Sequence, residues 1–208
     1  MSGQDFDHDL IAAAFRLAAD SGWARLTIAD AARAAGLPLD EARIRYPGKH
    51  ALLRRFGQRL DQAALSAASQ EGSVRDQLFD LLMGRFEAMK PHRDGIRALL
   101  RHLPSDPATT LLLACSTRLS MRWMLHAAGQ RTSGIRGALR VRGLIGVWLW
   151  TLRTFERDDS EDLSATMAAL DTALGRADRI ATCLSGGRSS TEPEPDESAV
   201  PESPEEPA

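Results

Sequence analysis

The sequence predicts an all-α protein of about nine helices. Segments rich in Ala, Leu and Arg recur with the helical period, whereas alternating β-branched runs and Asn-Gly turns are absent. The 208-residue chain is 43% hydrophobic and 26% charged, which is typical of a folded globular protein. We therefore expect an N-terminal three-helix unit, a larger helical body behind it and an appended tail.

Four helices are expected in the first 70 residues, at 7–20, 27–35, 39–46 and 49–69. Ser21-Gly22 ends the first of them. Thr27 can cap the second, with Asp30 at the capping-box position three residues later. Gly36 suits the left-handed turn between the two short helices, and Pro47 stops the second short helix. The segment 27–46 thus has the pattern of a helix-turn-helix.

Five longer helices are expected in the body, at 74–89, 93–103, 108–128, 135–157 and 163–181. The run 143–152 is apolar nearly all round, but a bilayer needs about 20 such residues. We therefore expect a buried or interfacial helix there and no integral membrane association. From Ser185 onward, Pro, Glu and Ser leave nothing to pack, which predicts a disordered acidic tail over 185–208.

Charge is distributed unevenly behind a net charge of −2. The tail holds seven acids against Arg188 alone. Segment 22–60, in contrast, has eight basic residues and only three acids. The basic residues are Arg25, Arg33, Arg43, Arg45, Lys49, Arg54, Arg55 and Arg59. Such an excess of positive charge can attract phosphate, although a solvated helical face is the alternative interpretation.

Several classes of site are not indicated. The acidic N-terminus lacks the features of an export signal, so we expect a cytoplasmic protein. Cys115 and Cys183 stand far apart without metal-ligand spacing, which favours reduced thiols in the core over a disulfide or a zinc site. No catalytic or cofactor motif occurs, and the acids at 158–162 are typical of helix caps. The sequence thus predicts neither an enzyme nor a cofactor.

The segment 26–53 has an ordered set of motif residues. A threonine cap, an Ala-Gly-hydrophobic turn and a closing aromatic are followed by a proline, a lysine and Ala-Leu-Leu. These positions hold Thr27, Ala35-Gly36-Leu37, Tyr46, Pro47, Lys49 and Ala51-Leu52-Leu53. With this order, and without insertion or deletion, the segment resembles the operator-binding unit of TetR-family regulators. The resemblance implies that a short second helix enters the major groove while basic side chains contact phosphates.

By residue, the resemblance implies three roles. Thr27 and Lys49 would anchor phosphates. The groove-facing residues would be Leu39, Glu41, Ala42 and Arg43. Arg33, Arg45 and Tyr46 would flank them.

The chain also departs from the pattern of this family. Pro38 replaces the small polar cap of the second helix and supplies no side-chain acceptor. Asp40 and Glu41 follow in its first turn, where acids favour the helix dipole but face DNA phosphates. Arg43 and Arg45 stand where the family usually has aromatic residues, which adds positive charge and removes stacking surface.

The segment 140–178 is similar to the lipid-binding accessory proteins of ubiquinone synthesis, which share the TetR fold. The similarity rests on the apolar run 143–152, the acids at 158–162, Thr166 and Leu170-Asp171. That family is expected to carry an amphipathic membrane helix at its C-terminus, where this chain has an acidic, Pro-rich tail. The resemblance therefore explains the body better than the ending.

Two hypotheses follow. The first is a ligand-responsive repressor, a homodimer through the last two helices that binds a palindromic operator in double-stranded DNA and is released by an apolar small molecule or lipid. Its DNA-binding domain would span 1–50 and its ligand-binding and dimerisation domain 51–184. The second is a lipid or isoprenoid carrier whose helix-turn-helix does not bind DNA. In either, core packing competes with pocket lining for Met83, Met121, Trp123, Met124 and Trp148, and for Met89 and Trp150.

Overall fold

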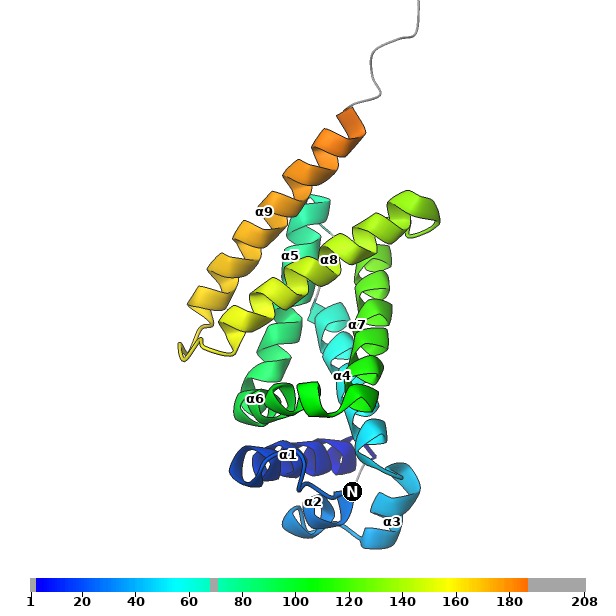
Figure 1. Ribbon diagram of the computed structural model, residues 1–208, viewed down its shortest axis with the longest axis vertical. Coiled ribbons are helices and arrows are strands. Elements are labelled where there is room, and N and C mark those ends of the chain that lie inside the picture. Colours follow the sequence, from blue (N-terminus) through cyan, green and yellow to red (C-terminus); the bar gives the residue numbers. More distant parts are fainter. Residues whose placement is uncertain (1–2, 68–70, 187–208) are drawn as a thin grey trace, which may run out of the picture.

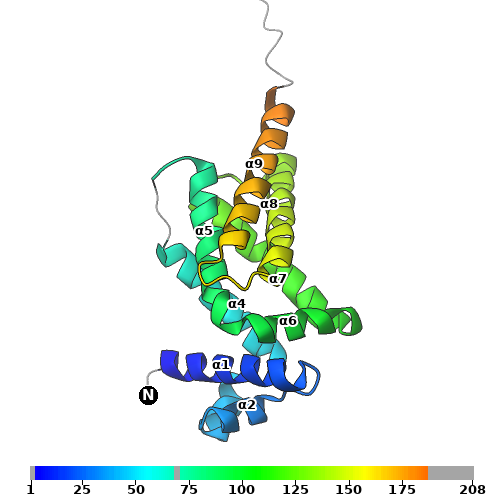
Figure 2. The same ribbon diagram turned by 90° about the vertical axis from the view of Figure 1, so that its left-hand side faces the viewer.

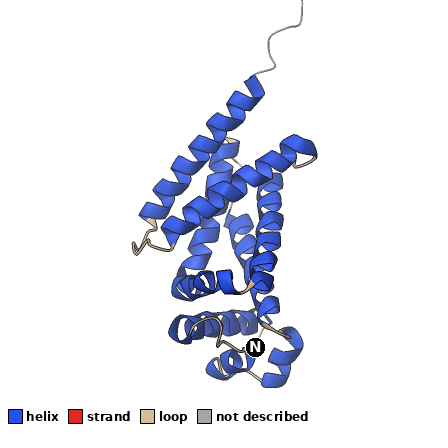
Figure 3. Ribbon diagram, viewed as in Figure 1, coloured by secondary structure: helices blue, strands red, loops and turns tan. Residues whose placement is uncertain are grey.

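The computed structural model describes residues 3–67 and 71–186, and within this part of the chain it contains helices and connecting loops but no strand (Figure 3). The all-α prediction is confirmed. The predicted tail lies outside the described residues except for its first two positions, which belong to the last helix.

The N-terminal unit forms one end of the molecule, with its first helix lying across it (Figure 1). Its helices are α1 (Gly3–Ser21), α2 (Ile28–Ala34) and α3 (Leu39–Arg45), and α4 (Lys49–Ala67) leads from it into the body. Helix α1 begins four residues before the predicted start at residue 7.

The body is a bundle of longer helices that packs on α1 mainly through α6 (Figure 2). Helices α8 and α9 lie side by side at the end far from α2 and α3, and α5 packs against α9. The helices of the body are α5 (Val74–Met89), α6 (Arg93–His102), α7 (Pro107–Ala127), α8 (Gly134–Phe155) and α9 (Ser164–Gly186).

The break predicted at Lys90-Pro91 is a continuous helical bend. A 3₁₀ turn, Lys90–His92, joins α5 to α6 without an intervening non-helical residue. Pro91 fits because it stands in the first turn of a helix, where its missing N–H costs no hydrogen bond. Counted as uninterrupted helical runs, the described residues form eight helices, so the prediction of about nine was one too many.

A single hydrophobic core extends from α1 to α9. Cys115 is not part of it: this cysteine is an exposed free thiol on α7, which corrects the expectation of a core position. The side chain of Cys183 lies outside the described residues. Among the described helices, none combines the length and the apolar character needed to cross a membrane.

The junction between the N-terminal unit and the body is a close crossing of α1 and α6. A Cβ atom on Gly95 of α6 would lie 2.2 Å from the carbonyl oxygen of Phe15 on α1 and 2.7 Å from its Cβ. No side chain fits in that space. The backbones meet here because position 95 has no side chain.

An aromatic cluster surrounds this crossing. The Phe15 ring lies 4.5 Å from Phe56 of α4 and 5.4 Å from His92 of the 3₁₀ turn, centroid to centroid. Burial lowers the pKa of His92 from 6.5 to about 4, and the charges of His8 and Arg59 add to this effect. The imidazole is therefore neutral near pH 7 and packs as an aromatic ring.

We expect Gly95→Ala to destabilise the fold by about 1–3 kcal/mol or more, because the added methyl group overpacks the α1–α6 crossing. The matched control is Gly57→Ala on α4, where a Cβ atom meets nothing within 4 Å. There the gain in helix propensity is expected to stabilise the fold by about 0.5–1 kcal/mol. Chemical denaturation of both variants measures the two effects, and equal stabilities would contradict the close crossing.

Stability is expected to fall between pH 6.5 and about pH 4 through His92. Its pKa is lower in the folded state, so over this interval the unfolded chain binds the proton that the folded chain excludes. The full penalty is reached below about pH 4. In His92→Phe, urea unfolding measured at pH 7, 5.5 and 4.5 should show a flatter pH dependence, and an unchanged slope would assign the effect to other groups.

Candidate nucleic-acid interface and helical cleft

The turn between α2 and α3 has the geometry that the sequence predicts. Thr27 caps α2: its Oγ1 accepts the Asp30 N–H at 3.1 Å and donates to the Asp30 carboxylate at 2.6 Å. Gly36 has φ +66°, and the Leu37 N–H closes the end of the helix on the Ala32 carbonyl at 2.8 Å. The two short helices are thus held in a fixed helix-turn-helix arrangement. Pro38 stands at the N-cap of α3 and provides no side-chain hydrogen bond.

Only part of the predicted groove-facing set lies on the outer surface of α3. Leu39 and Arg43 are exposed and Glu41 is half-buried, but Ala42 is 1% exposed and belongs to the core. Ala42 therefore does not belong to the outward face. Ile44 does, with 82% of its surface exposed, and the sequence analysis did not single it out.

The basic side chains of this unit are mostly engaged within the protein. Arg33 pairs with Asp30 at 2.9 Å, and Arg45 pairs with Glu41 at 2.5 Å. Arg43 donates to the Pro47 carbonyl at 3.1 Å. These exposed contacts are weak and exchangeable, so they orient the guanidinium groups without burying them.

Lys49 is more firmly bound. Its Nζ donates to the carbonyl oxygens of Trp23 and Ala24 at 3.1 and 3.3 Å and lies 5.7 Å from the Trp23 ring centroid. The lysine thereby fixes the α1–α2 connection to the start of α4. Two other arginines, Arg25 in that connection and Arg54 on α4, are exposed, and their side chains have no hydrogen bond or ion pair within the part of the chain that the structure describes.

A buried carboxylate ties α1, α3 and α4 together. Asp7 is 4% exposed and accepts hydrogen bonds from the Tyr46 hydroxyl at 2.5 Å and from Arg55 Nε at 2.6 Å. Arg45 lies 4.0 Å from the same carboxylate. Burial raises the pKa of Tyr46 above its usual value, and the bond to Asp7 adds to this, so the hydroxyl remains a donor. Tyr46, expected to flank the groove contacts, is instead buried in this network.

Sequence reasoning missed Asp7 and Arg55 as partners. Asp7 and Arg55 are 48 positions apart in the sequence, and Asp7 and Tyr46 are 39 apart, so no local sequence pattern predicts either contact. Asp7 entered the sequence analysis only as one of the acids near the N-terminus.

The body contains a cleft of about 670 Å³ between α5, α8 and α9. None of the five pocket candidates lines it. Met83, Met121, Met124 and Trp148 are buried in the core, and Trp123 is 58% exposed on α7. Trp150, for which the sequence analysis left core packing and pocket lining as alternatives, does line the cleft.

Trp148 is held by its neighbours in the core. Its ring stacks on Phe86 at 4.4 Å between centroids, and the buried Arg85 guanidinium lies 5.0 Å from its ring. Arg85 forms an ion pair with Asp61, which also accepts from the Ser120 hydroxyl at 2.7 Å. Burial lowers the pKa of Arg85 to about 10. This network fastens α4, α5, α7 and α8 to one another.

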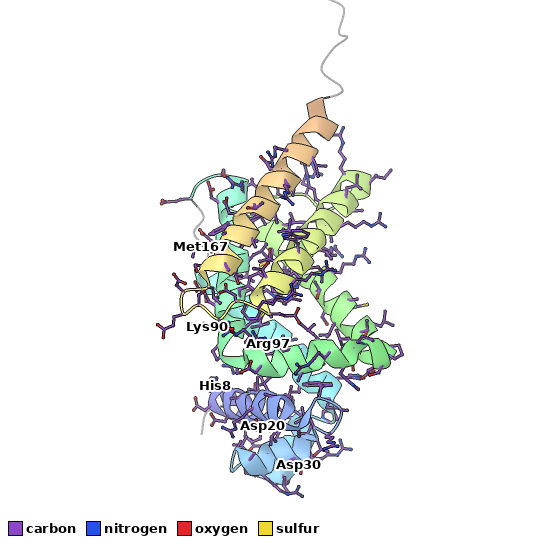
Figure 4. The ribbon with its side chains drawn as sticks, turned by 60° about the vertical axis from the view of Figure 1, so that its left-hand side comes forward. His8, Asp20, Asp30, Lys90, Arg97 and Met167 are labelled. Atoms are coloured by element: carbon purple, nitrogen blue, oxygen red, sulfur yellow. The ribbon has the colours of Figure 1, made fainter. Side chains whose placement is uncertain are left out.

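The connection between α8 and α9 is fastened to α6. Arg97 donates to the Glu156 carbonyl and reaches the Asp159 carboxylate at 3.2 Å, and Lys90 donates to the Glu161 carbonyl. Figure 4 shows Lys90 and Arg97 where the end of α5 and α6 meet this connection. Because α6 also packs on α1, the connection is linked to the N-terminal unit through one helix.

Two of the acids predicted as caps, Asp158 and Asp162, accept N–H groups near the start of α9, whereas Asp159 pairs with Arg93 and Arg97. Asp158 is buried and accepts from the Thr166 N–H at 2.7 Å and the Thr166 hydroxyl at 2.6 Å, and Asp162 accepts from the Ser164 N–H at 3.1 Å. Burial opposes the charge of Asp158, but the hydrogen bonds from Ser160 and Thr166 outweigh it and lower its pKa to about 2. No cluster of potential metal ligands occurs among the described residues.

Comparison of the sequence with protein-family models gave no match, and comparison with curated proteins gave none either. The fold, in contrast, is similar to solved structures of TetR transcriptional regulators. One from Nitrosomonas europaea has a TM-score of 0.69 at 20% identity, covering 84% of this chain and 99% of its own. One from Streptomyces coelicolor has a TM-score of 0.63 at 19% identity, covering 88% and 85%. The chain therefore has the TetR fold.

We expect Tyr46→Phe to destabilise the protein by about 1–3 kcal/mol, because it removes a donor from a buried carboxylate. In an Asp7→Ala background the same substitution should cost less than about 0.5 kcal/mol, since the acceptor is already absent. Denaturant unfolding of the four proteins of this cycle measures the coupling. Additive costs would show that the hydroxyl and the carboxylate do not act together.

Proposed function

We propose that this protein is a DNA-binding, one-component transcriptional regulator of the TetR type that acts in the cytoplasm as a ligand-responsive repressor. The observation that supports it is the helix-turn-helix of α2 and α3, held by the Thr27 cap, the Gly36 turn and the buried Asp7 on a fold shared with TetR regulators. Four solved structures of similar fold are transcriptional regulators, and none of these favours the carrier hypothesis.

In this proposal α3 enters the major groove. Its exposed Leu39, Arg43 and Ile44 provide two apolar contacts and one bidentate donor for base edges. Glu41 is neutralised by Arg45, so one uncompensated acid, Asp40, remains in the first turn. The first turn of α3 therefore repels DNA phosphates less than its two acids suggest.

Phosphate contacts come from the edges of the unit. Thr27 caps α2 and Arg33 lies on it. Lys49 starts α4, and Arg25 and Arg54 have exposed side chains on the neighbouring segments. The guanidinium of Arg33 exchanges its contact with Asp30 for a phosphate at little cost, because both groups are exposed. Lys49 acts mainly by holding the α1–α2 connection in position.

The proposed domains are residues 1–50 for DNA and 51–184 for ligand binding and dimerisation. Helix α4 runs unbroken across this boundary, which supports a mechanical link between the two. A homodimer would use α8 and α9, where Leu149, Met167 and Ile180 expose apolar surface. Two recognition helices must then fit successive major grooves about 34 Å apart, so small shifts in the body change operator affinity.

The experiment that tests this function is selection of duplexes from genomic DNA by the purified protein, followed by sequencing. We expect enrichment of a palindromic sequence. Equal recovery of all sequences would refute the regulator.

On the selected duplex, Arg43→Gln is expected to reduce discrimination against mismatched sites by about 1–3 kcal/mol, because it removes a base contact. Arg25→Gln and Arg54→Gln should each lower the slope of log affinity against log salt by about 0.9, the value for one phosphate contact. The control is Arg142→Gln, an exposed arginine on α8. Fluorescence anisotropy titrations at several salt concentrations measure these effects, and identical slopes for all variants would contradict the proposed contacts.

A further inference from the structure

One side of α7 remains exposed in the part of the chain that the structure describes. Three of its large apolar side chains, Leu111, Leu119 and Trp123, are 66%, 56% and 58% exposed. Contiguous apolar surface of this kind is typical of an interaction site. We call this side of the helix the α7 face, and its exposed residues are Leu111, Cys115, Arg118, Leu119, Arg122, Trp123 and His126.

The α7 face is positively charged. The side chains of Arg118 and Arg122 make no hydrogen bond or ion pair within residues 3–67 and 71–186. The segment 107–155, which supplies α7 and α8, contains seven arginines and no acid, so neither helix neutralises them. Unpaired arginines beside exposed apolar side chains favour a partner that is both acidic and partly apolar.

A hollow at the α7–α8 turn continues this surface. Its volume is about 480 Å³, and it is lined by Arg122, His126 and residues 129–133. His126 bonds to the Thr132 hydroxyl at 2.6 Å, which holds the turn against α7. The exposed Arg131 brings a third guanidinium group to the hollow. The positive surface therefore extends from the α7 face around the start of α8.

The end of α9 lies beside the same turn. Gln130 lines both the hollow and the cleft of the body, and Ile180 and Ala181 of α9 line that cleft as well. Helix α9 ends at Gly186, at the end of the molecule far from α2 and α3 (Figure 1). The residues that follow Gly186 therefore start close to the basic surface of the turn and far from the arginines of the helix-turn-helix.

The segment 192–207 has the composition that this surface favours. It contains seven acids, five prolines and no basic residue. Its prolines at 201, 204 and 207 recur at every third position, and glutamates stand at 202 and 205. A polyproline II segment has three residues per turn, so this spacing places prolines on one side and carboxylates on another. Proline-rich segments of this conformation bind to surfaces with exposed aromatic rings.

The segment is also long enough. The six residues from Gly186 to Glu192 span at most about 20 Å. In the polyproline II conformation residues 192–207 span about 47 Å at 3.1 Å per residue. The α7 face measures about 22 Å from Leu111 to His126 at 1.5 Å per residue. The segment can therefore pass the hollow at the turn and continue along α7.

We propose that the acidic, proline-rich segment 192–207 docks on the α7 face and the adjoining hollow of its own chain. Its carboxylates pair with Arg118, Arg122 and Arg131, and its prolines pack on Trp123. Neither α2, α3 nor the surface proposed for the homodimer takes part, because α8 lies between α7 and α9 (Figure 1). The inference therefore goes beyond the proposed function and does not depend on DNA binding.

The covalent connection favours this segment over other acidic partners. A short flexible connection gives an effective concentration in the mM range, so even a site of about 1 mM affinity is about half occupied. A separate partner must reach that concentration in solution. The contact is mainly ionic, so it weakens when the Debye length falls from about 10 Å at 0.1 M salt to about 3 Å at 1 M.

The test is a nuclear magnetic resonance measurement on the full chain with a nitroxide in the segment. The label is attached at Ala199→Cys, with Cys115→Ser and Cys183→Ser to remove the other thiols. The indole N–H signal of Trp123 is expected to lose at least about half of its intensity at low salt. Trp150, which is 51% exposed on α8, is the matched control and should lose far less. At 1 M salt the signal of Trp123 should recover.

Charge variants identify the contacts. The double variant Arg118→Gln, Arg122→Gln should lower the relaxation enhancement at Trp123 at least about threefold, because two exposed ion pairs are lost. All three arginines compared are exposed, so the variants should fold normally. Arg153→Gln, which removes an exposed arginine of α8 outside the α7 face, should leave the enhancement unchanged. An equal effect of the two changes would overturn the proposed contacts.

Other outcomes distinguish the alternatives. Equal losses at Trp123 and Trp150, or a loss at Trp150 alone, would show that the segment does not dock on α7. In a mixture of nitroxide-carrying protein without isotope label and isotope-labelled protein without nitroxide, Trp123 should keep its intensity. A loss there would place the segment on another copy of the chain and overturn the proposal. An unchanged Trp123 signal in the nitroxide-carrying chain that shifts when duplex DNA is added would assign the α7 face to nucleic acid and refute the docking.

Discussion

The crossing of α1 and α6 at Gly95 is the contact on which the rest of the arrangement depends. A side chain at this position would collide with the backbone of Phe15, so the two helices approach closely only with glycine there. Helix α1 also carries Asp7, which holds α3 and α4, and α6 carries Arg97, which holds the α8–α9 connection. The N-terminal unit and the body are therefore joined by two closely packed helices, each of which is bonded to the rest of its own part. A change at either side of this crossing reaches the other through packed helices.

The charges of the N-terminal unit serve its own structure first. Asp7 is buried with two close donors, and removing one partner of a buried charge costs several kcal/mol because the other remains uncompensated. Lys49 is likewise bound to two backbone carbonyl oxygens. The basic excess of segment 22–60 consequently overstates the charge that is available to a partner. The exposed arginines, which pair weakly or not at all, are the groups that can exchange water for phosphate.

The sequence predicted what local rules determine. The Thr27 cap, the Gly36 turn and the stop at Pro47 depend on residues within a few positions of one another, and the structure has them as predicted. Contacts between distant segments were not predictable. Tyr46 is buried with its hydroxyl on Asp7 of α1, and Ala42 is buried on α3, which packs against α2. No periodicity in a seven-residue helix reveals which of its sides is covered. The cleft was missed for a different reason. The sequence analysis assigned the pocket to large apolar residues such as Met121 and Met124, which are buried in the core. The cleft lies instead where side chains are small, as at Gly143 and Gly146.

A ligand bound in the body would alter DNA affinity only if it bound two arrangements of the protein unequally. Helices α8 and α9 lie far from α3 in the molecule (Figure 1). One connection between them runs through the α8–α9 loop and α6 to α1, and another runs through α7 to α4. Arg93 and Arg97, both largely buried, contact the exposed Asp159 carboxylate in that loop at 3.5 and 3.2 Å. The Gly95 crossing leaves no room for sliding. Helix α6 packs closely on α1 at one side and contacts the α8–α9 loop at the other. A change in the position of α9 would therefore reach α1 through α6.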